Sequence, residues 1–97
     1  MKTVQLDGVQ LTQRAEALDC LARAFDLPDW WGRNLDALHD CLTEIGEPTR
    51  VELLNRGALE DTRFGLGVLR VLTDAAGENP RLELTEAETP EEEGDRI

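Results

Sequence analysis

The order of strand and helix patterns along the chain constrains its fold more than any other feature. Three strand patterns alternate apolar and polar residues, and helical patterns separate each strand from the next. The strands are predicted at about 2–6, 50–55 and 81–85, and the helices at about 12–25, 34–45 and 62–76. Strands joined through a helix pair in parallel, with a right-handed crossover. The pattern therefore predicts an α/β fold in which a small three-stranded parallel sheet packs against helices.

Helix boundaries can be placed from capping residues and breakers. Thr12 and Asn34 are predicted N-caps of the first two helices, and Pro28 prevents the first helix from continuing. The residues at 46–48, Gly-Glu-Pro, stop the second helix, and Gly77 closes the third. Residues 26–33, between the first two helices, are then predicted to form a structured loop.

The chain has 97 residues, a length typical of one domain, and 21 acids against 10 bases give a formal net charge of −11. We expect a domain at 1–85 and an acidic, disordered tail at 86–97, because the tail holds six acids, one base and no apolar period. The acidity argues against binding to nucleic acid or to an anionic membrane, both of which require basic residues. It favours either a basic partner or solubility alone.

The cysteine and histidine content indicates neither a metal site nor a disulfide framework. Cys20 and Cys41 are far apart in apolar-periodic segments, and His39 is the single histidine. The start of the chain has no apolar segment typical of a signal peptide, and no run is long enough to span a membrane. We therefore expect a cytoplasmic protein with reduced thiols and no cofactor.

The second predicted helix has two unlike sides. Its core side carries Leu35, Leu38, Leu42 and Ile45, with Ala37 and Cys41 beside them. Its other side carries Asp36, His39, Asp40 and Thr43. Asp36 is explained by its place in the first helical turn, but an Asp–Asp pair at i, i+4 costs a few tenths of a kcal/mol through repulsion. This side is either an acidic face that binds positive charge or a solvated helix face.

Two adjacent tryptophans occupy the loop before this helix. One of Trp30 and Trp31 is expected to anchor the loop on the core, and the other to be exposed beside the acidic face. An exposed aromatic side chain next to carboxylates is typical of an interface hot spot. The sequence alone does not decide which tryptophan is exposed.

The sequence offers little for catalysis. It contains no serine, and His39 and Cys41 are two residues apart on one helix, so they point in different directions. Asp36 and Asp40 are one turn apart, but a convex helix face implies no cleft. Asp36, His39 and Asp40 lack the further ligands that a metal site needs. We therefore predict a protein that is not an enzyme and holds no metal.

Residues 27–43 read Leu-Pro-Asp-Trp-Trp-Gly-Arg-Asn-Leu-Asp-Ala-Leu-His-Asp-Cys-Leu-Thr. This ungapped segment closely resembles the barstar family of intracellular inhibitors of barnase-type ribonucleases. The order of strands and helices over residues 1–85 also resembles that family, as does, less specifically, the segment 68–75.

The resemblance implies inhibition by occlusion, in which the second helix and the preceding loop enter the ribonuclease active site. By position, Trp30 matches the loop aromatic that covers the catalytic pocket. Asp36 and Asp40 match aspartates that meet the enzyme's cations, and Asp40 resembles the one that takes the place of the substrate phosphate. Asp74 stands where the family has a glutamate that also faces basic residues. His39 and Thr43 share this surface.

The sequence departs from the family in ways that affect the choice of target. His39 and Ile45 replace tryptophans, and Glu44 replaces a glycine at the helix end. The predicted contact surface is therefore less aromatic and more acidic, and the target need not be barnase itself. We expect a free monomer that binds a basic, barnase-like ribonuclease one to one. The alternative is an acidic interaction module of the same fold that binds a basic partner other than a nuclease.

Overall fold

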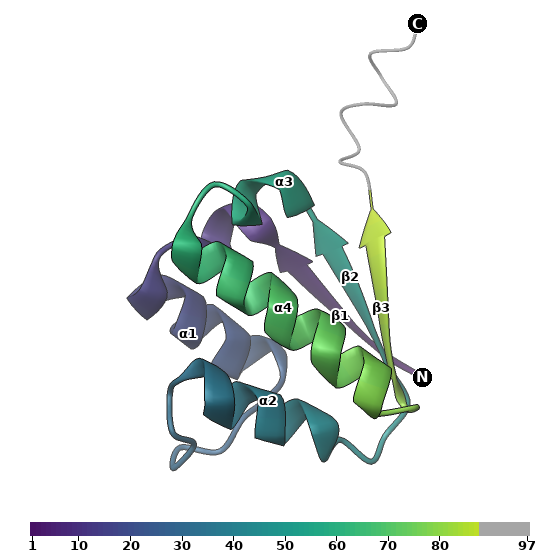
Figure 1. The fold of residues 1–97 in the computed structure, drawn as a ribbon. Helices are drawn as coiled ribbons and strands as arrows, with labels where there is room; N and C mark the ends of the chain where they lie inside the picture. Colours follow the sequence, from purple (N-terminus) through teal and green to yellow (C-terminus); the bar gives the residue numbers. More distant parts are fainter. Residues whose placement is uncertain (88–97) are drawn as a thin grey trace, which may run out of the picture.

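Three parallel strands form the sheet, as the sequence predicted, in a computed structural model that describes residues 1–87. The strands are β1 (Lys2–Asp7), β2 (Thr49–Leu54) and β3 (Leu82–Ala87), in the spatial order β1-β2-β3. Lys2 lies opposite Thr49, and Thr49 lies opposite Leu82. All three strands therefore begin at the same edge of the sheet (Figure 1).

The helices lie over one face of this sheet. Within residues 1–87 they are η1 (Gly8–Leu11, a 3₁₀ helix), α1 (Arg14–Ala24), α2 (Leu35–Thr43), α3 (Arg56–Leu59) and α4 (Arg63–Glu78). Figure 1 shows α1, α2 and α4 together on one side of the strands. Burial alternates accordingly, since Val4 and Leu6 of β1 are buried whereas Thr3 and Gln5 are exposed. None of the helices in this part of the chain is long and apolar enough to cross a membrane.

The core fills the space between the sheet and these helices. Its side chains of 2% exposure or less include Leu6, Leu11, Leu21, Leu38, Leu42, Val51, Leu53, Leu59, Val68 and Leu72. Each of the three long helices and all three strands contribute buried residues to this cluster. The core therefore fixes how α2 lies against α4, which is the arrangement that matters for the site below.

The first helix begins later than predicted. Thr12 does not cap it, because the chain first forms η1, whose N-terminus is capped by the Asp7 carboxylate accepting from Val9 N–H at 3.0 Å. A side chain at Gly8 would collide with the backbone carbonyl of Asn55, so the chain needs glycine where η1 passes the end of β2. α1 then starts at Arg14.

The carboxyl-terminal strand continues two residues beyond its predicted end. β3 includes Glu86 and Ala87, which lie opposite Leu53 and Leu54 of β2. Glu86 Oε2 also lies 3.0 Å from Arg56 Nε on α3. Residues 86 and 87, predicted as the start of the acidic tail, are therefore part of the sheet, and the rest of that predicted tail (88–97) lies outside the described residues.

Candidate partner-binding surface

Helix α2 begins where its capping chemistry predicts. The Asn34 Oδ1 atom accepts a hydrogen bond from Ala37 N–H at 2.7 Å, and the Asn34 amide donates to the Gly32 carbonyl at 3.1 Å. Leu38 and Leu42 are fully buried on the inner side of the helix. This inner anchoring turns the opposite side of α2 outward.

The outward side of α2 presents two carboxylates. Asp36 and Asp40 are both exposed and lie one helical turn apart. Thr43, a further turn along, is half-buried and its hydroxyl donates to the Asp40 carbonyl at 3.0 Å. The Thr43 hydroxyl is therefore engaged within its own helix, whereas the carboxylates remain open to solvent.

A third carboxylate reaches this face from α4. His39 Nε2 lies 3.1 Å from Glu78 Oε2, and His39 Nδ1 lies 3.9 Å from Asp40 Oδ1. The imidazole, which is partly buried, thus sits between a carboxylate of α2 and one of α4. Glu78 was not predicted from the sequence. The signal that could have found it is its position one turn after Asp74 on the exposed side of the same helix.

A buried amide fixes the far end of α2 against the end of α4. Asn79 is 5% exposed, and its Nδ2 group donates to the carbonyls of Leu42 and Ile45 at 2.9 and 3.0 Å. The Leu42 carbonyl lies in the last turn of α2 and also accepts from Ile45 N–H at 3.4 Å, and Ile45 lies just beyond the end of the helix. Asn79 therefore caps one helix from the end of another, and it helps to hold His39 beside Glu78.

Asp74, the predicted site residue on α4, is exposed and lies one turn before Glu78. Its Oδ2 atom lies 3.8 Å from Arg70 Nε, and that arginine is itself largely exposed. Ion pairs of this length between exposed side chains contribute little to stability. Asp74 is consequently available to another cation. We refer to Asp36, His39, Asp40, Asp74 and Glu78 as the acidic surface.

The structure decides which tryptophan is exposed. Trp31 is 6% exposed and belongs to the hydrophobic core, whereas Trp30 is 84% exposed. Trp31 N–H donates to the Pro28 carbonyl at 3.1 Å, which closes a turn around Trp30. Trp30 therefore projects from the loop that leads directly into α2.

The cysteines are free thiols in the described residues. Burial raises the pKa of the Cys41 thiol, and the nearby carboxylates of Glu44 and Asp40 raise it further. Cys41 is thus a packed, protonated side chain at neutral pH. Across residues 1–87, no group of three His, Cys, Asp or Glu side chains is arranged to hold a metal ion.

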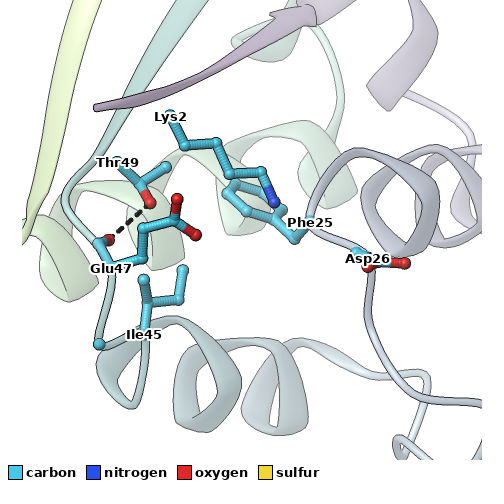
Figure 2. Close-up of a pocket in the computed structure, with 7 residues that line it drawn as sticks. Lys2, Phe25, Asp26, Ile45, Glu47 and Thr49 are labelled. Carbon is cyan, nitrogen blue, oxygen red and sulfur yellow. Dashed lines mark hydrogen bonds between the residues drawn. The ribbon is translucent and has the colours of Figure 1, made fainter.

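A hollow of about 240 Å³ lies at the edge of the sheet where the strands begin (Figure 2). It is lined by Lys2, Phe25, Asp26, Ile45, Gly46, Glu47 and Thr49. None of the acidic-surface residues lines it, and the Thr49 hydroxyl there is already bonded to the Glu47 carbonyl at 2.8 Å. The acidic surface itself lies on the outward sides of two helices, α2 and α4, and does not enclose a small-ligand pocket.

Comparison with known proteins identifies the family of this chain. The family model described as Barstar (barnase inhibitor) matches residues 1–85, which is most of the sequence. The chain belongs to the barstar family. This assignment agrees with the observed fold and with the resemblance in residues 27–43.

A curated relative comes from Bacillus subtilis (strain 168) and is named "Putative ribonuclease inhibitor YrdF". The two proteins are 44% identical over 43 residues, a segment that covers 44% of this chain and 47% of the relative. The match therefore spans about half the length of that curated relative.

Proposed function

We propose that this protein is a cytoplasmic inhibitor that binds the basic active site of a barnase-type ribonuclease and occludes it. The observation that carries the proposal is the acidic surface, with the exposed Trp30 on the loop before it, on a member of the barstar family. A ribonuclease active site must hold phosphate, so it is basic and complements this surface.

Each side chain has a distinct part in the proposed complex. Asp40 takes the place of a substrate phosphate among arginine and lysine side chains, and Asp36 pairs with cations one turn away. Glu78 and Asp74 extend the negative charge on α4. Trp30 covers the catalytic pocket and buries apolar area, as central aromatic anchors do in protein interfaces.

The geometry of the free protein favours tight binding. α2 is anchored by Leu38 and Leu42 and capped at both ends, by Asn34 and by Asn79. The backbone that carries Asp36 and Asp40 is therefore already ordered, and binding requires little further ordering of it. No bond is made or broken in this mechanism, because inhibition follows from exclusion of the substrate.

The test is inhibition of a panel of barnase-type ribonucleases by the wild-type protein and by Asp40→Ala. Truncating one partner of a desolvated charge pair costs about 2–5 kcal/mol, so we expect Asp40→Ala to weaken inhibition by thirtyfold or more. Asp61→Ala removes an exposed acid between α3 and α4 and controls for net charge. Absence of inhibition across the panel, or equal inhibition by Asp40→Ala and wild type, would contradict the proposal.

A second function is favoured by the composition of the acidic surface. His39 stands where the family carries a tryptophan, which leaves the outward side of α2 with a smaller apolar contact area. A basic partner other than a nuclease would be recognised mainly through charge. Capture of a partner that lacks a basic nucleic-acid cleft, in a manner dependent on Asp36 and Asp40, would favour this alternative.

A further inference from the structure

A salt bridge fastens the loop that carries Trp30 to helix α1. Arg33 Nη2 lies 2.8 Å from Asp19 Oδ1, and the two residues are 14 positions apart in the sequence. The pair closes a ring that contains the second half of α1 and the whole loop. None of the roles assigned above uses either side chain.

The backbone of this loop needs such a fastening. Asp26 at its start and Arg33 at its end both have left-handed conformations, with φ of 56° and 53°. Residues other than glycine occupy this region only where the surrounding structure compensates for its cost. Leu27 N–H, bonded to the Ala22 carbonyl at 2.9 Å, holds the first end of the loop. The Arg33–Asp19 pair holds the last end to the same helix.

Trp30 lies between these two fastened ends. The residue is 84% exposed, so packing against the rest of the protein does little to fix its side chain. The position of the ring relative to α2 must therefore come from the backbone of the loop. That backbone is set by the buried Trp31, by Asn34 and by the Arg33–Asp19 pair.

We propose that Asp19 and Arg33 are positioning residues for partner binding, which order the loop so that Trp30 is presented beside the acidic surface before the partner arrives. The inference rests on the proposed function, in which Trp30 contacts the ribonuclease. A loop ordered in advance loses less conformational freedom on binding. Pairing with Asp19 also directs the Arg33 cation toward α1, where it does not repel a basic partner.

The test compares variants that break the pair from either side. Asp19→Asn removes the negative charge of the pair with little change in shape. Arg33→Asn removes the positive charge and introduces a residue that tolerates the left-handed conformation. Glu60→Gln is the matched control, because it breaks an exposed ion pair of 2.9 Å with Arg56 away from the loop. Circular dichroism establishes that all variants fold.

The first measurement is the time-resolved fluorescence anisotropy of the free protein. We expect Asp19→Asn and Arg33→Asn to increase the amplitude of the fast motion of Trp30, and Glu60→Gln to leave it unchanged. The second measurement is the dissociation constant for barnase. Exposed pairs contribute modestly, so we expect each variant to weaken binding by about two- to fivefold. The double variant should be no weaker than either single variant, because both remove the same interaction.

Failure of this inference is distinguishable from failure of the proposed function. Trp30 motion that is unchanged in both variants overturns the positioning role whether or not barnase binds. A dissociation constant that neither single variant changes also overturns the positioning role, as does a double variant in which the two single effects add. The proposed function stays intact in both cases. Absence of wild-type inhibition across the ribonuclease panel contradicts the proposed function itself, and with it a positioning role in ribonuclease binding.

Discussion

At the scale of single residues, the two adjacent tryptophans illustrate how neighbouring side chains of the same type take different roles. Trp31 anchors the loop in the core, and Trp30 lies in solvent. The sequence predicts that one tryptophan is buried and the other exposed, but not which is which. That choice depends on the turn between Pro28 and Trp31, which is set by a backbone hydrogen bond rather than by the side-chain pattern.

The tryptophans therefore give opposite predictions. We expect Trp31→Ala to lower the free energy of unfolding by about 3–5 kcal/mol, as large-to-small changes in a core do. We expect Trp30→Ala to change it by less than about 0.5 kcal/mol but to weaken ribonuclease binding by about thirtyfold or more. Urea unfolding and an inhibition assay measure the two effects. Equal stability losses in both variants would contradict the assignment.

Cys41 gives a prediction about pH. Its pKa is raised in the folded protein by burial and by the carboxylates of Glu44 and Asp40. The unfolded chain therefore loses the Cys41 proton at lower pH than the folded protein does. The contribution of Cys41 to the free energy of unfolding is complete below the pKa that this thiol has in the unfolded chain. It is lost as the pH rises through the higher pKa that the thiol has in the folded protein.

The raised pKa also predicts that the Cys41 thiol reacts more slowly in the folded protein, because the thiolate is the reactive form. In a Cys20→Ala background, we expect iodoacetamide to alkylate Cys41 more slowly in the folded protein than in urea between pH 7 and 9, with the folded rate rising only at higher pH. Mass spectrometry of quenched samples gives both rates. A folded Cys41 that reacts faster than the unfolded one would contradict the raised pKa.

At the scale of elements, two glycines in α4 lie in different surroundings. A side chain at Gly65 would collide with the backbone carbonyl of Leu59 on α3, whereas one at Gly77 would meet nothing within 4 Å. Gly65 thus permits close packing of α3 on α4. Gly77 only lowers the helix propensity of the last turn.

These surroundings predict effects of opposite sign. We expect Gly65→Ala to destabilise the protein by about 1–3 kcal/mol through overpacking against backbone. We expect Gly77→Ala to stabilise it by up to about 1 kcal/mol, since alanine is the better helix former. Urea denaturation measures both. Stabilisation by Gly65→Ala would mean that α3 does not pack as described.

The longer elements could be predicted from the sequence, and the short ones could not. The strands and the helices α1, α2 and α4 have apolar periods long enough to recognise, and Asn34 marks the start of α2. α3 has four residues, and its N-cap Asn55 makes no capping hydrogen bond, so neither period nor cap revealed it. η1 displaced the predicted start of α1 because Asp7 caps a 3₁₀ turn first.

At the scale of the whole molecule, the acidic surface is a product of packing between distant parts of the chain. The α2 carboxylates and Asp74 could be predicted from periodicity and resemblance. Glu78 could not, because its place beside His39 depends on how α4 lies along α2, which Asn79 and the shared core determine. Part of the net charge of −11 is therefore gathered on one face of the molecule, as the proposed binding of a basic partner requires.

The most direct test of this account is competition between the protein and a mononucleotide inhibitor for the active site of a barnase-type ribonuclease. The apparent dissociation constant is measured at increasing nucleotide concentration for wild type, Asp61→Ala and Asp36→Ala/Asp40→Ala. We predict that the constant for wild type and Asp61→Ala rises in proportion to nucleotide, and that the double variant binds far more weakly throughout. Wild-type binding that is independent of nucleotide, or unaffected by loss of both aspartates, would contradict occlusion by the acidic surface.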